Sequence, residues 1–409
     1  MDRLEVFFDV VFVFAFFNIS RTAYGMINPV GLLQALLPLA LLWRAWSAHI
    51  FVVNRVRPGE GAAPLVMFAA MAAAFLFGLS IPRAFSDEPG GLPGPLLITC
   101  CYATIRILHL LLFWRSAVGN PGLRRQLIWL VAPVIGTTAA LLAAAVIPAH
   151  LPADSRNEAR LALWIFALLI EYGWLWTPRM WSSSIVSAEH WVERFELIII
   201  IAVGESIISV GIGSNLIGGQ ISWPVAIAAI LAIAVTAALW WGYFDHIAPK
   251  VHDVMNATEG RARNALVRDA YICLHLPMVA GVILFAVGGE DMLHHLGELD
   301  VDLSIPLPGP GEVLTYGGVI LFFLGHLAFQ LRVLGTMAWP RVVAIALLAG
   351  MLPLVGHLPA LAAMVILPGI CVLLIVSEAV FLGESRLFLK QPDVRRRLEE
   401  SRSAGEAEG

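Results

Sequence analysis

The segment VERFELIIIIAVGESIISVGIGS, residues 192–214, decides the fold class of this chain. From Leu197 onward it contains a single charged side chain, Glu205, among isoleucine, valine, alanine, glycine and serine residues. About 20 mostly apolar residues are what an α-helix needs to cross the hydrocarbon core of a bilayer. We therefore expect residues 192–214 to form a membrane-spanning helix that carries a carboxyl group into the apolar layer.

The composition of the whole chain agrees with this segment. Of its 409 residues 59% are hydrophobic and only 14% are charged, and the mean hydropathy is +0.81, whereas soluble domains carry roughly 25% charged residues. At about 20 residues for each membrane-spanning helix, the length allows about a dozen spans and leaves no room for a separate soluble domain. The net charge of -4 argues against nucleic acid as a partner.

Long apolar runs separated by charged residues, proline and glycine predict an all-α polytopic membrane protein with about 12 transmembrane helices. The expected spans are residues 4–24, 30–53, 63–82, 95–114, 127–148, 160–178, 192–214, 223–246, 268–288, 315–334, 341–357 and 359–383. Residues 391–409 form a polar tail that we expect to begin as a short helix and then fray.

The basic residues are distributed unevenly between the two sides that these spans define. Nineteen of the 26 Lys and Arg residues fall on the side of the N-terminus, and four fall on the other side. Because loops rich in Lys and Arg stay in the cytoplasm, we expect a multi-pass protein of the cytoplasmic membrane with both termini in the cytoplasm. Membrane lipids are the partners that this location implies.

Several classes of function lack the residues that they need. The cysteines all fall within apolar runs, which leaves no disulfide framework and no paired-thiol metal motif; they are Cys100, Cys101, Cys273 and Cys371. Both lysines, Lys250 and Lys390, lie at polar boundaries, and a phosphate-binding GK[ST] loop is absent from the sequence. The sequence also lacks a G-x-S-x-G elbow and an H-E-x-x-H motif. We expect no metal and no cofactor, and an enzyme is the weaker hypothesis.

Matching polar motifs recur in the two halves of the chain in the same order. They are Glu5-x-Phe7 with Glu193-x-Phe195, Trp43-x-x-Trp46-x-x-His49 with Trp240-x-x-Tyr243-x-x-His246, His109-x5-Arg115 with His326-x5-Arg332, and Glu171-x7-Arg179 with Glu378-x7-Arg386. Four correspondences in register predict a duplication, with residues 1–186 as the first six-helix repeat and residues 187–390 as the second. An even number of spans in each repeat makes the two repeats parallel.

Ionisable side chains inside the spans are the candidate functional groups, because each costs about 2.5–3.5 kcal/mol to insert and therefore faces the interior of a bundle or a water-filled cavity. The expected substrate or proton pathway comprises Glu5, Asp9, Arg44, His49, Arg106, His109, Glu193, Arg194, Glu205, His246, His275 and His326. Secondary candidates are Glu171, Glu378, Ser206 and Ser209. We expect the pathway residues to point inward and to form one or two polar clusters.

Glu205 is the deepest carboxylate of this set, roughly 20 Å along its span at 1.5 Å per residue. Arg194 and Ser209 share its helical face, and Gly204 precedes it. The alternative for such groups is a buried ion pair that only fixes helix packing. Pairing with an arginine while remaining accessible to water would mark Glu205 as part of a transport pathway.

Two other groups of residues have a simpler interpretation. Aromatic residues near the ends of two spans are expected to anchor the protein at the membrane interface; they are Trp43, Trp46, Trp240, Trp241 and Tyr243. The histidines at this level, His49 and His246, either belong to the pathway or bond to interface groups. The stretch 290–312, with His294, His295 and six acidic residues, is expected to be a flexible acidic loop rather than a cation site.

Three segments of the sequence resemble the bacterial low temperature requirement protein A (LtrA) family. They are LEVFFDVVFV at residues 4–13, HWVERF at 190–195 with GESII at 204–208, and RDAY at 268–271 with LHLP at 274–277. Val6 and Val10 stand where leucine is typical of that family, and Glu196 stands where a small or neutral residue is typical. The resemblance implies a polytopic bacterial membrane protein whose family name refers to growth in the cold, and it implies no particular reaction.

We draw three functional hypotheses from these observations. Parallel repeats with buried titratable groups favour a secondary, proton-coupled transporter of a small solute or ion that the sequence does not identify. A membrane-embedded enzyme acting on a lipid or a lipid-linked precursor is the alternative, and a non-catalytic membrane scaffold is the third. A polar site between the halves would favour transport, a lateral opening at headgroup depth would favour lipid chemistry, and dry packing would favour a scaffold. The sequence predicts no particular oligomeric state.

Overall fold

The computed structural model describes residues 3–55, 61–86, 91–182, 185–213, 222–245, 247–297, 303–307 and 309–389. These residues are helices and short connections without a β-strand, which confirms the all-α fold class. The first half contains α1 (Arg3–Tyr24), α2 (Pro29–Val53), α3 (Ala63–Ser80), α4 (Gly94–Ala117), α5 (Pro121–Val146) and α6 (Ala153–Trp174). Three short 3-10 helices follow α3, α5 and α6: η1 (Ile81–Arg83), η2 (Ile147–His150) and η3 (Pro178–Trp181).

The second half begins with α7 (Ala188–Gly213) and α8 (Trp223–Phe244), followed by two short helices, α9 (Ala248–Ala257) and α10 (Gly260–Leu266). A π-helical segment, η4 (Val267–Cys273), joins α10 to α11 (Leu274–Leu296). The chain then forms α12 (Gly311–Leu334), α13 (Trp339–Val355) and α14 (Ala360–Leu389). The helix that contains residues 268–288 is therefore longer than the sequence indicates.

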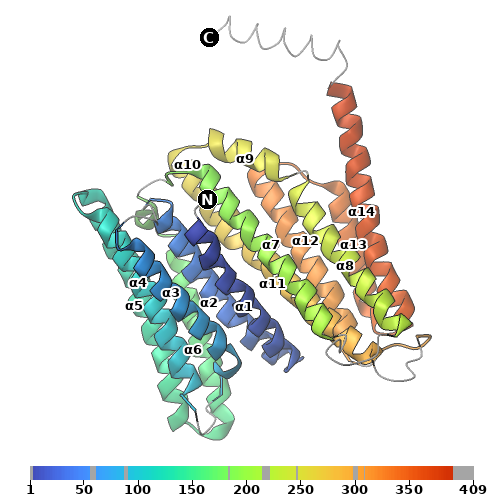
Figure 1. Ribbon diagram of the computed structural model, residues 1–409, viewed down its shortest axis with the longest axis horizontal. Helices are drawn as coiled ribbons and strands as arrows, with labels where there is room; N and C mark the ends of the chain where they lie inside the picture. The colour runs from blue at the N-terminus through green and yellow to red at the C-terminus, as the bar shows by residue number, and fades with distance from the viewer. Residues whose placement is uncertain are drawn as a thin grey trace, which may run out of the picture.

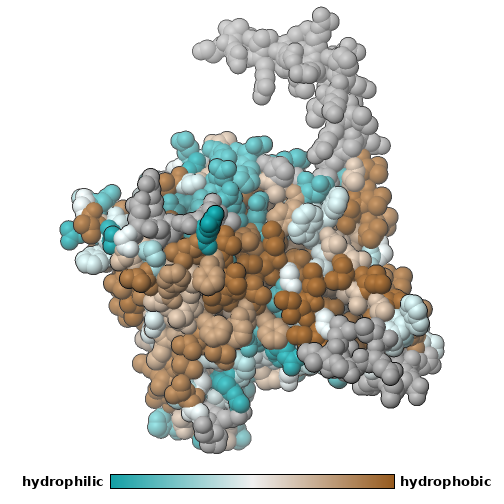
Figure 2. Space-filling view, in the orientation of Figure 1, coloured by the Kyte–Doolittle hydropathy of each residue, from teal (hydrophilic) through white to brown (hydrophobic). Residues whose placement is uncertain are grey.

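Ten of the described helical segments are long and apolar enough to cross a membrane. The remaining two predicted spans correspond to α6 and α13, which lie beside them in the bundle. Helix α13 has only 17 residues, and the first turns of α6 carry charged side chains such as Asp154 and Glu158. On the face that Figure 2 shows, a broad apolar belt crosses the bundle, and hydrophilic side chains gather over α9 and α10 at one end.

Local signals in the sequence explain where several helices begin. The side chain of Asn28 accepts a hydrogen bond from the Gly31 amide at the start of α2, and Asn120 does the same for two amides at the start of α5. Proline at the first helical position, Pro29 in α2 and Pro121 in α5, fits there because its missing N–H would have no helical partner. Capped starts of this kind fix the helix boundaries before any packing occurs.

Figure 1 shows α3 to α6 on one side of the bundle, α8, α12, α13 and α14 on the other, and α1, α2, α7 and α11 between them. Helix α1 contacts α7 and α11, so the two halves meet along these elements. Helix α1 begins and α14 ends at the same end of the bundle, where α9 and α10 also lie (Figure 1). We call this the N-terminal end.

Helices α11 and α12 approach each other closely, because glycines face each other across their contact. A methyl group added at Gly281 would lie 2.6 Å from both the Gly318 carbonyl oxygen and the Phe322 amide nitrogen. One added at Gly288 would lie 2.5 Å from the Gly311 carbonyl oxygen. Small residues at such contacts let two membrane helices pack backbone against backbone.

The substitution Gly281→Ala should therefore separate α11 from α12 and destabilise the protein by about 1–3 kcal/mol, the usual cost of overpacking. The matched control is Gly317→Ala, because no atom lies within 4 Å of the position that its methyl group would take. Thermal unfolding in detergent measures both variants. A melting temperature of Gly281→Ala equal to that of Gly317→Ala would contradict this account of the contact.

Candidate functional site

Buried ionisable groups form a network where the two halves of the chain meet. Asp9 of α1 accepts a hydrogen bond from the Arg194 guanidinium of α7 at 2.6 Å and another from the indole of Trp46 of α2 at 2.9 Å. Glu5, one turn before Asp9, lies 2.6 Å from the His190 ring and 3.6 Å from Arg194. We call these five residues the interface network. Asp9, Glu5 and Arg194 are each at most 2% exposed.

The spacing along the two helices explains why these contacts form in pairs. Residues four apart lie on one face of a helix, so Glu5 and Asp9 face α7 together, as His190 and Arg194 face α1. Removing one partner from a buried pair costs about 3–5 kcal/mol because it leaves an uncompensated charge. The network therefore fixes both the register and the mutual orientation of α1 and α7.

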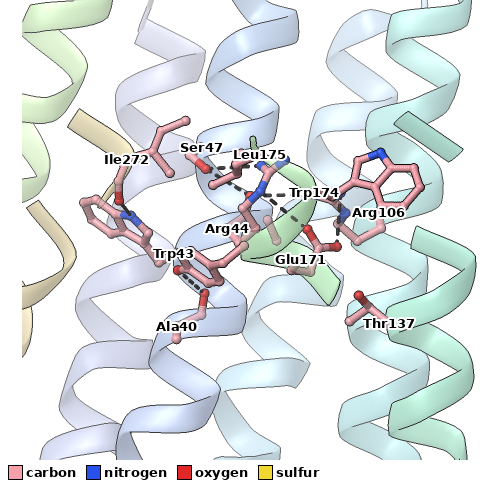
Figure 3. A network of polar contacts seen from close by, with 12 residues as sticks. Ala40, Trp43, Arg44, Ser47, Arg106, Thr137, Glu171, Trp174, Leu175 and Ile272 are labelled. Atoms are coloured by element: carbon pink, nitrogen blue, oxygen red, sulfur yellow. Dashed lines mark hydrogen bonds and ion pairs between the residues drawn. The ribbon is translucent and has the colours of Figure 1, made fainter. Parts of the chain in front are cut away.

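A second network of ionisable groups lies within the first half, and its charged members are buried. Arg44 of α2 and Arg106 of α4 lie 3.4 Å and 3.3 Å from the carboxylate of Glu171 on α6, and all three are at most 2% exposed. Figure 3 shows the two guanidinium groups approaching this carboxylate from different sides. The hydroxyl of Tyr102 also donates to Glu171. Glu171 thus ties three helices together.

Two histidines lie beside this first-half network. The rings of His49 and His109 are 5.7 Å apart, and His49 also stacks on Phe8 of α1 at 5.4 Å. Neither ring nitrogen of His109 has a hydrogen-bond partner within the described part of the chain. The adjoining void, lined by Arg44 and His109 among others, measures only about 20 Å³, which is room for roughly one water molecule. The site is sealed.

A third network lies in the second half and borders open space. Arg341 of α13 lies 2.8 Å from Glu378 of α14, bonds to a ring nitrogen of His326 on α12, and is 1% exposed. A cavity of about 410 Å³ reaches Arg341 and Glu378, and Lys250 and Gln330 also line it. Its rim includes exposed residues of the connection between α12 and α13, so this pair is accessible from the surface near the N-terminal end.

His275 lies at the centre of the second half, one residue after α11 begins. Its ring nitrogens contact the Tyr243 hydroxyl at 2.9 Å and the Ala270 carbonyl oxygen at 3.0 Å, and the ring stacks on Tyr271. The preceding π-helical turn and Pro277 both interrupt the regular α-helical hydrogen-bond pattern at this point. Such interruptions allow a helix to bend.

Glu205 is fully buried in α7 and accepts a hydrogen bond from the Ser209 hydroxyl at 2.5 Å. It has no arginine partner among the described residues, and its second carboxylate oxygen is without a hydrogen bond there. Ser20 of α1 and Glu290 of α11 lie near it. Pairing with an arginine therefore does not explain the burial of Glu205.

The remaining expected residues are not among the members of the networks described above. Glu193 is half-buried on α7 rather than enclosed, and Ser206 is buried and bonds to the Val203 carbonyl oxygen of its own helix. His246 lies outside the described residues. The expected set thus does not form one cluster. It divides into the three networks, the His275 environment and the Glu205–Ser209 pair.

The expectation of an interface belt is wrong for three of the five aromatic residues. Trp43 and Trp46 are at most 2% exposed, because their indole N–H groups donate to Ile272 and Asp9 inside the bundle. Tyr243 is also buried, whereas Trp240 and Trp241 are 43% and 44% exposed, as interface anchors would be. Hydropathy at the end of a span does not distinguish an indole that faces lipid from one that faces a buried carboxylate.

The expectation of a flexible acidic loop is wrong for its first and last residues. Helix α11 continues to Leu296, and Glu290 within it is 2.6 Å from Arg21 of α1. Glu312 is 2% exposed in the first turn of α12. Pairing with a distant arginine and burial against neighbouring helices were not visible in the local charge pattern. Residues 298–302 and 308 lie outside the described residues.

Besides Trp46, three participants in the networks were not among the expected site residues. His190 precedes Arg194 by one turn and faces Glu5, so the shared four-residue spacing of the two helices was a usable signal. Arg341 is the first residue of the expected span 341–357, so the sequence places it at the end of a helix rather than inside the bundle. Tyr102 has no signal in the sequence, because its role depends on the approach of Glu171 from α6.

Comparison with known proteins identifies the family. The model of the bacterial low temperature requirement A protein (LtrA) matches residues 1–376. The chain belongs to the LtrA family. An uncharacterized protein of Rhizobium meliloti (strain 1021) is 26% identical over 370 residues, which cover 86% of this chain and 82% of the relative.

The segments that resemble the LtrA family also supply the central contacts. The first contains Glu5 and Asp9, the second contains His190 and Arg194, and the third contains His275. The three segments therefore lie along α1, α7 and α11, where the halves meet. Across the described residues, no group of three His, Cys, Asp or Glu side chains is arranged to hold a metal ion.

Replacing Glu171 with glutamine should destabilise the protein by about 3–5 kcal/mol, because two buried guanidinium groups lose their shared counter-charge. The matched control is Glu158→Gln, an exposed carboxylate on the same helix. Thermal unfolding of both purified variants provides the measurement. Equal melting temperatures would mean that Glu171 does not hold α2, α4 and α6 together.

A second variant separates a structural role from a functional one. The triple variant combines Arg44→Met, Arg106→Met and Glu171→Leu. It removes the three charges and also the free-energy cost of desolvating them. We expect this triple variant to recover at least half of the stability lost in Glu171→Gln. A triple variant as unstable as the single variant would contradict the interpretation that charge imbalance causes the loss.

Proposed function

We propose that this LtrA-family protein is a secondary transporter of a small polar solute or ion, coupled to proton movement. The observation that carries the proposal is the cavity of about 410 Å³ that reaches the Arg341–Glu378 pair inside the second half. Buried charged pairs that are open to one side only are typical of a transporter caught in one of its access states. A non-catalytic scaffold with dry packing would not need a cavity that reaches a buried charged pair.

We further propose that the chain forms twelve membrane crossings, arranged as two parallel six-helix repeats at residues 1–186 and 187–390. The helix contacts support this proposal. In the first half α1 packs on α2 and α3, α3 on α4, α4 on α5, α5 on α6, and α6 on α2. In the second half α7 packs on α8 and α11, α11 on α12, α12 on α13, α13 on α14, and α14 on α8. The two patterns correspond helix by helix, with α11 in the place of α3.

Under this correspondence the two halves have matching glutamates in different surroundings. Glu171 of α6 and Glu378 of α14 each pair with arginine. Glu378 itself lines a cavity of about 410 Å³, whereas near Glu171 only its partner Arg44 lines a void, of about 20 Å³. Glu171 has two arginines, so its charge stays fixed in place. Glu378 has one arginine and access to water, which suits a group that releases and binds a proton. We assign the transport site to the second half.

The geometry of α11 supports a change in access. The π-helical turn, Pro277 and His275 lie together next to Tyr243 of α8. A bend at this point would shift α8 relative to α12 and α14 around the cavity. The distribution of basic residues favours a cytoplasmic N-terminal end. With that orientation the cavity opens toward the cytoplasm in this state.

Proton movement in liposomes tests the proposal. The purified chain is reconstituted in vesicles that contain a pH-sensitive dye, and pools of amino acids, carboxylic acids and inorganic cations are added outside. We expect at least one pool to change the internal pH with the wild-type chain, and Glu378→Gln to abolish that change. Comparison of metabolites in cells with and without the protein would select the pools.

The matched control for the flux assay is Glu158→Gln, which removes an exposed carboxylate and should leave the flux unchanged. Wild-type flux in a correctly folded Glu378→Gln variant would remove the second-half site from the mechanism. Glu205→Gln is a useful second variant, because Glu205 is buried without an arginine partner among the described residues. Loss of flux without loss of stability would place Glu205 on the proton pathway.

A membrane-embedded enzyme acting on a lipid or lipid-linked precursor is the second candidate, and one observation favours it. An apolar groove of about 360 Å³ runs between α13 and α14 on the lipid-facing surface. The groove shares Trp339 and Pro340 with the cavity at Glu378. A lipid tail in the groove would bring its headgroup toward the Arg341–Glu378 pair. A change in lipid composition without solute flux would favour this candidate.

A further inference from the structure

A separate cavity opens at the N-terminal end, where the two halves of the chain meet. It measures about 600 Å³ and lies between η3, which follows α6, and α10 with η4, which precede α11. The residues that line this seam cavity are Pro178, Arg179, Trp181, Ser182, Gly260, Arg261, Asn264, Ala265 and Arg268. Three of them are arginines, and no carboxylate is among these lining residues.

The positive charge of the seam cavity is only partly balanced. Asp269 lies 2.6 Å from Arg268, but it also lies 2.9 Å from Arg332 and so divides one negative charge between two guanidinium groups. Arg179 and Arg261 are exposed. Within the described residues no carboxylate forms an ion pair with either of them. The cavity therefore has an excess of positive charge.

Aromatic side chains hold two of these guanidinium groups in place. Arg179 lies over the ring of Trp129 at 4.8 Å, and Arg268 lies over the ring of Trp176 at 4.1 Å. Stacking on an indole fixes the plane of a guanidinium group while leaving its N–H groups free to donate at the edge. Ordered arginines lose less entropy when they bind an anion than mobile ones would.

The backbone at the seam is also held together. The side-chain amide of Asn264 donates to the Trp181 carbonyl oxygen at 3.1 Å, which joins α10 to η3. Gly260, which begins α10, has a φ of +57° that favours glycine, and open space surrounds the position that a side chain would take. The cavity is thus bounded by fixed segments from both halves of the chain.

We propose that the seam cavity binds a phosphate group. Arginine donates paired hydrogen bonds that match the geometry of phosphate oxygens, and three arginines in one cavity suit a doubly or singly charged phosphate. Basic pockets between helices on the cytoplasmic side of membrane proteins bind anionic headgroups. The phosphate belongs either to an anionic phospholipid or to a soluble phosphate compound. This inference does not depend on the transport proposal.

Binding to the purified full-length chain in uncharged detergent tests the inference. The probes are phosphatidylglycerol, with phosphatidylcholine as its zwitterionic comparison, and inorganic phosphate at constant ionic strength, with chloride as its comparison. The cavity variant combines Arg179→Gln with Arg261→Gln. We expect a dissociation constant raised by about tenfold or more, because each lost bond is to a charged group.

The matched control combines Arg124→Gln with Arg125→Gln, two exposed arginines at the start of α5 that do not line the cavity. Weaker phosphatidylglycerol binding in the cavity variant alone supports a lipid ligand. Weaker inorganic phosphate binding in the cavity variant alone supports a soluble one. Equal losses in both variants, or no binding of either probe by the wild type, overturn the inference. The single variant Arg261→Gln replaces the double variant if the latter fails to fold.

Discussion

The rest of the structure depends on the burial of Asp9 and Arg194 against each other. Each charge alone would be costly in an apolar bundle, so neither α1 nor α7 can take its position without the other. Glu5 with His190 repeats the constraint one turn away, and the Trp46 indole extends it to α2. Because α1 belongs to the first half and α7 to the second, this contact fixes how the halves meet.

Helix α11 extends that constraint through the second half. It packs on α1 and α7 and lies backbone against backbone with α12 at the facing glycines Gly281 and Gly318. The π-helical turn and Pro277 lie just before Gly281, at the start of α11, and interrupt the regular hydrogen bonds of the helix. The backbone contact with α12 therefore begins about one turn after this interruption.

Glu171 and Glu378 are similar residues in different surroundings. Two arginines and a tyrosine contact Glu171, and the void lined by one of those arginines, Arg44, holds roughly one water molecule. Glu378 has one arginine and a cavity of about 410 Å³. Pairing and the size of the neighbouring cavity, rather than residue type, distinguish these two buried carboxylates.

The sequence alone determined the helical membrane class, the positions of most helices, and the need for Asp9, Arg44, Arg106, Arg194 and Glu205 to be buried. These follow from local composition, because the cost of placing charge in an apolar layer is a property of the residue itself. The tertiary structure decided the partners: Trp46 faces Asp9 instead of the membrane interface, and Arg341 lies inside the bundle against Glu378. Partner choice depends on which helices become neighbours, and that is set by packing over the whole bundle rather than by any single segment.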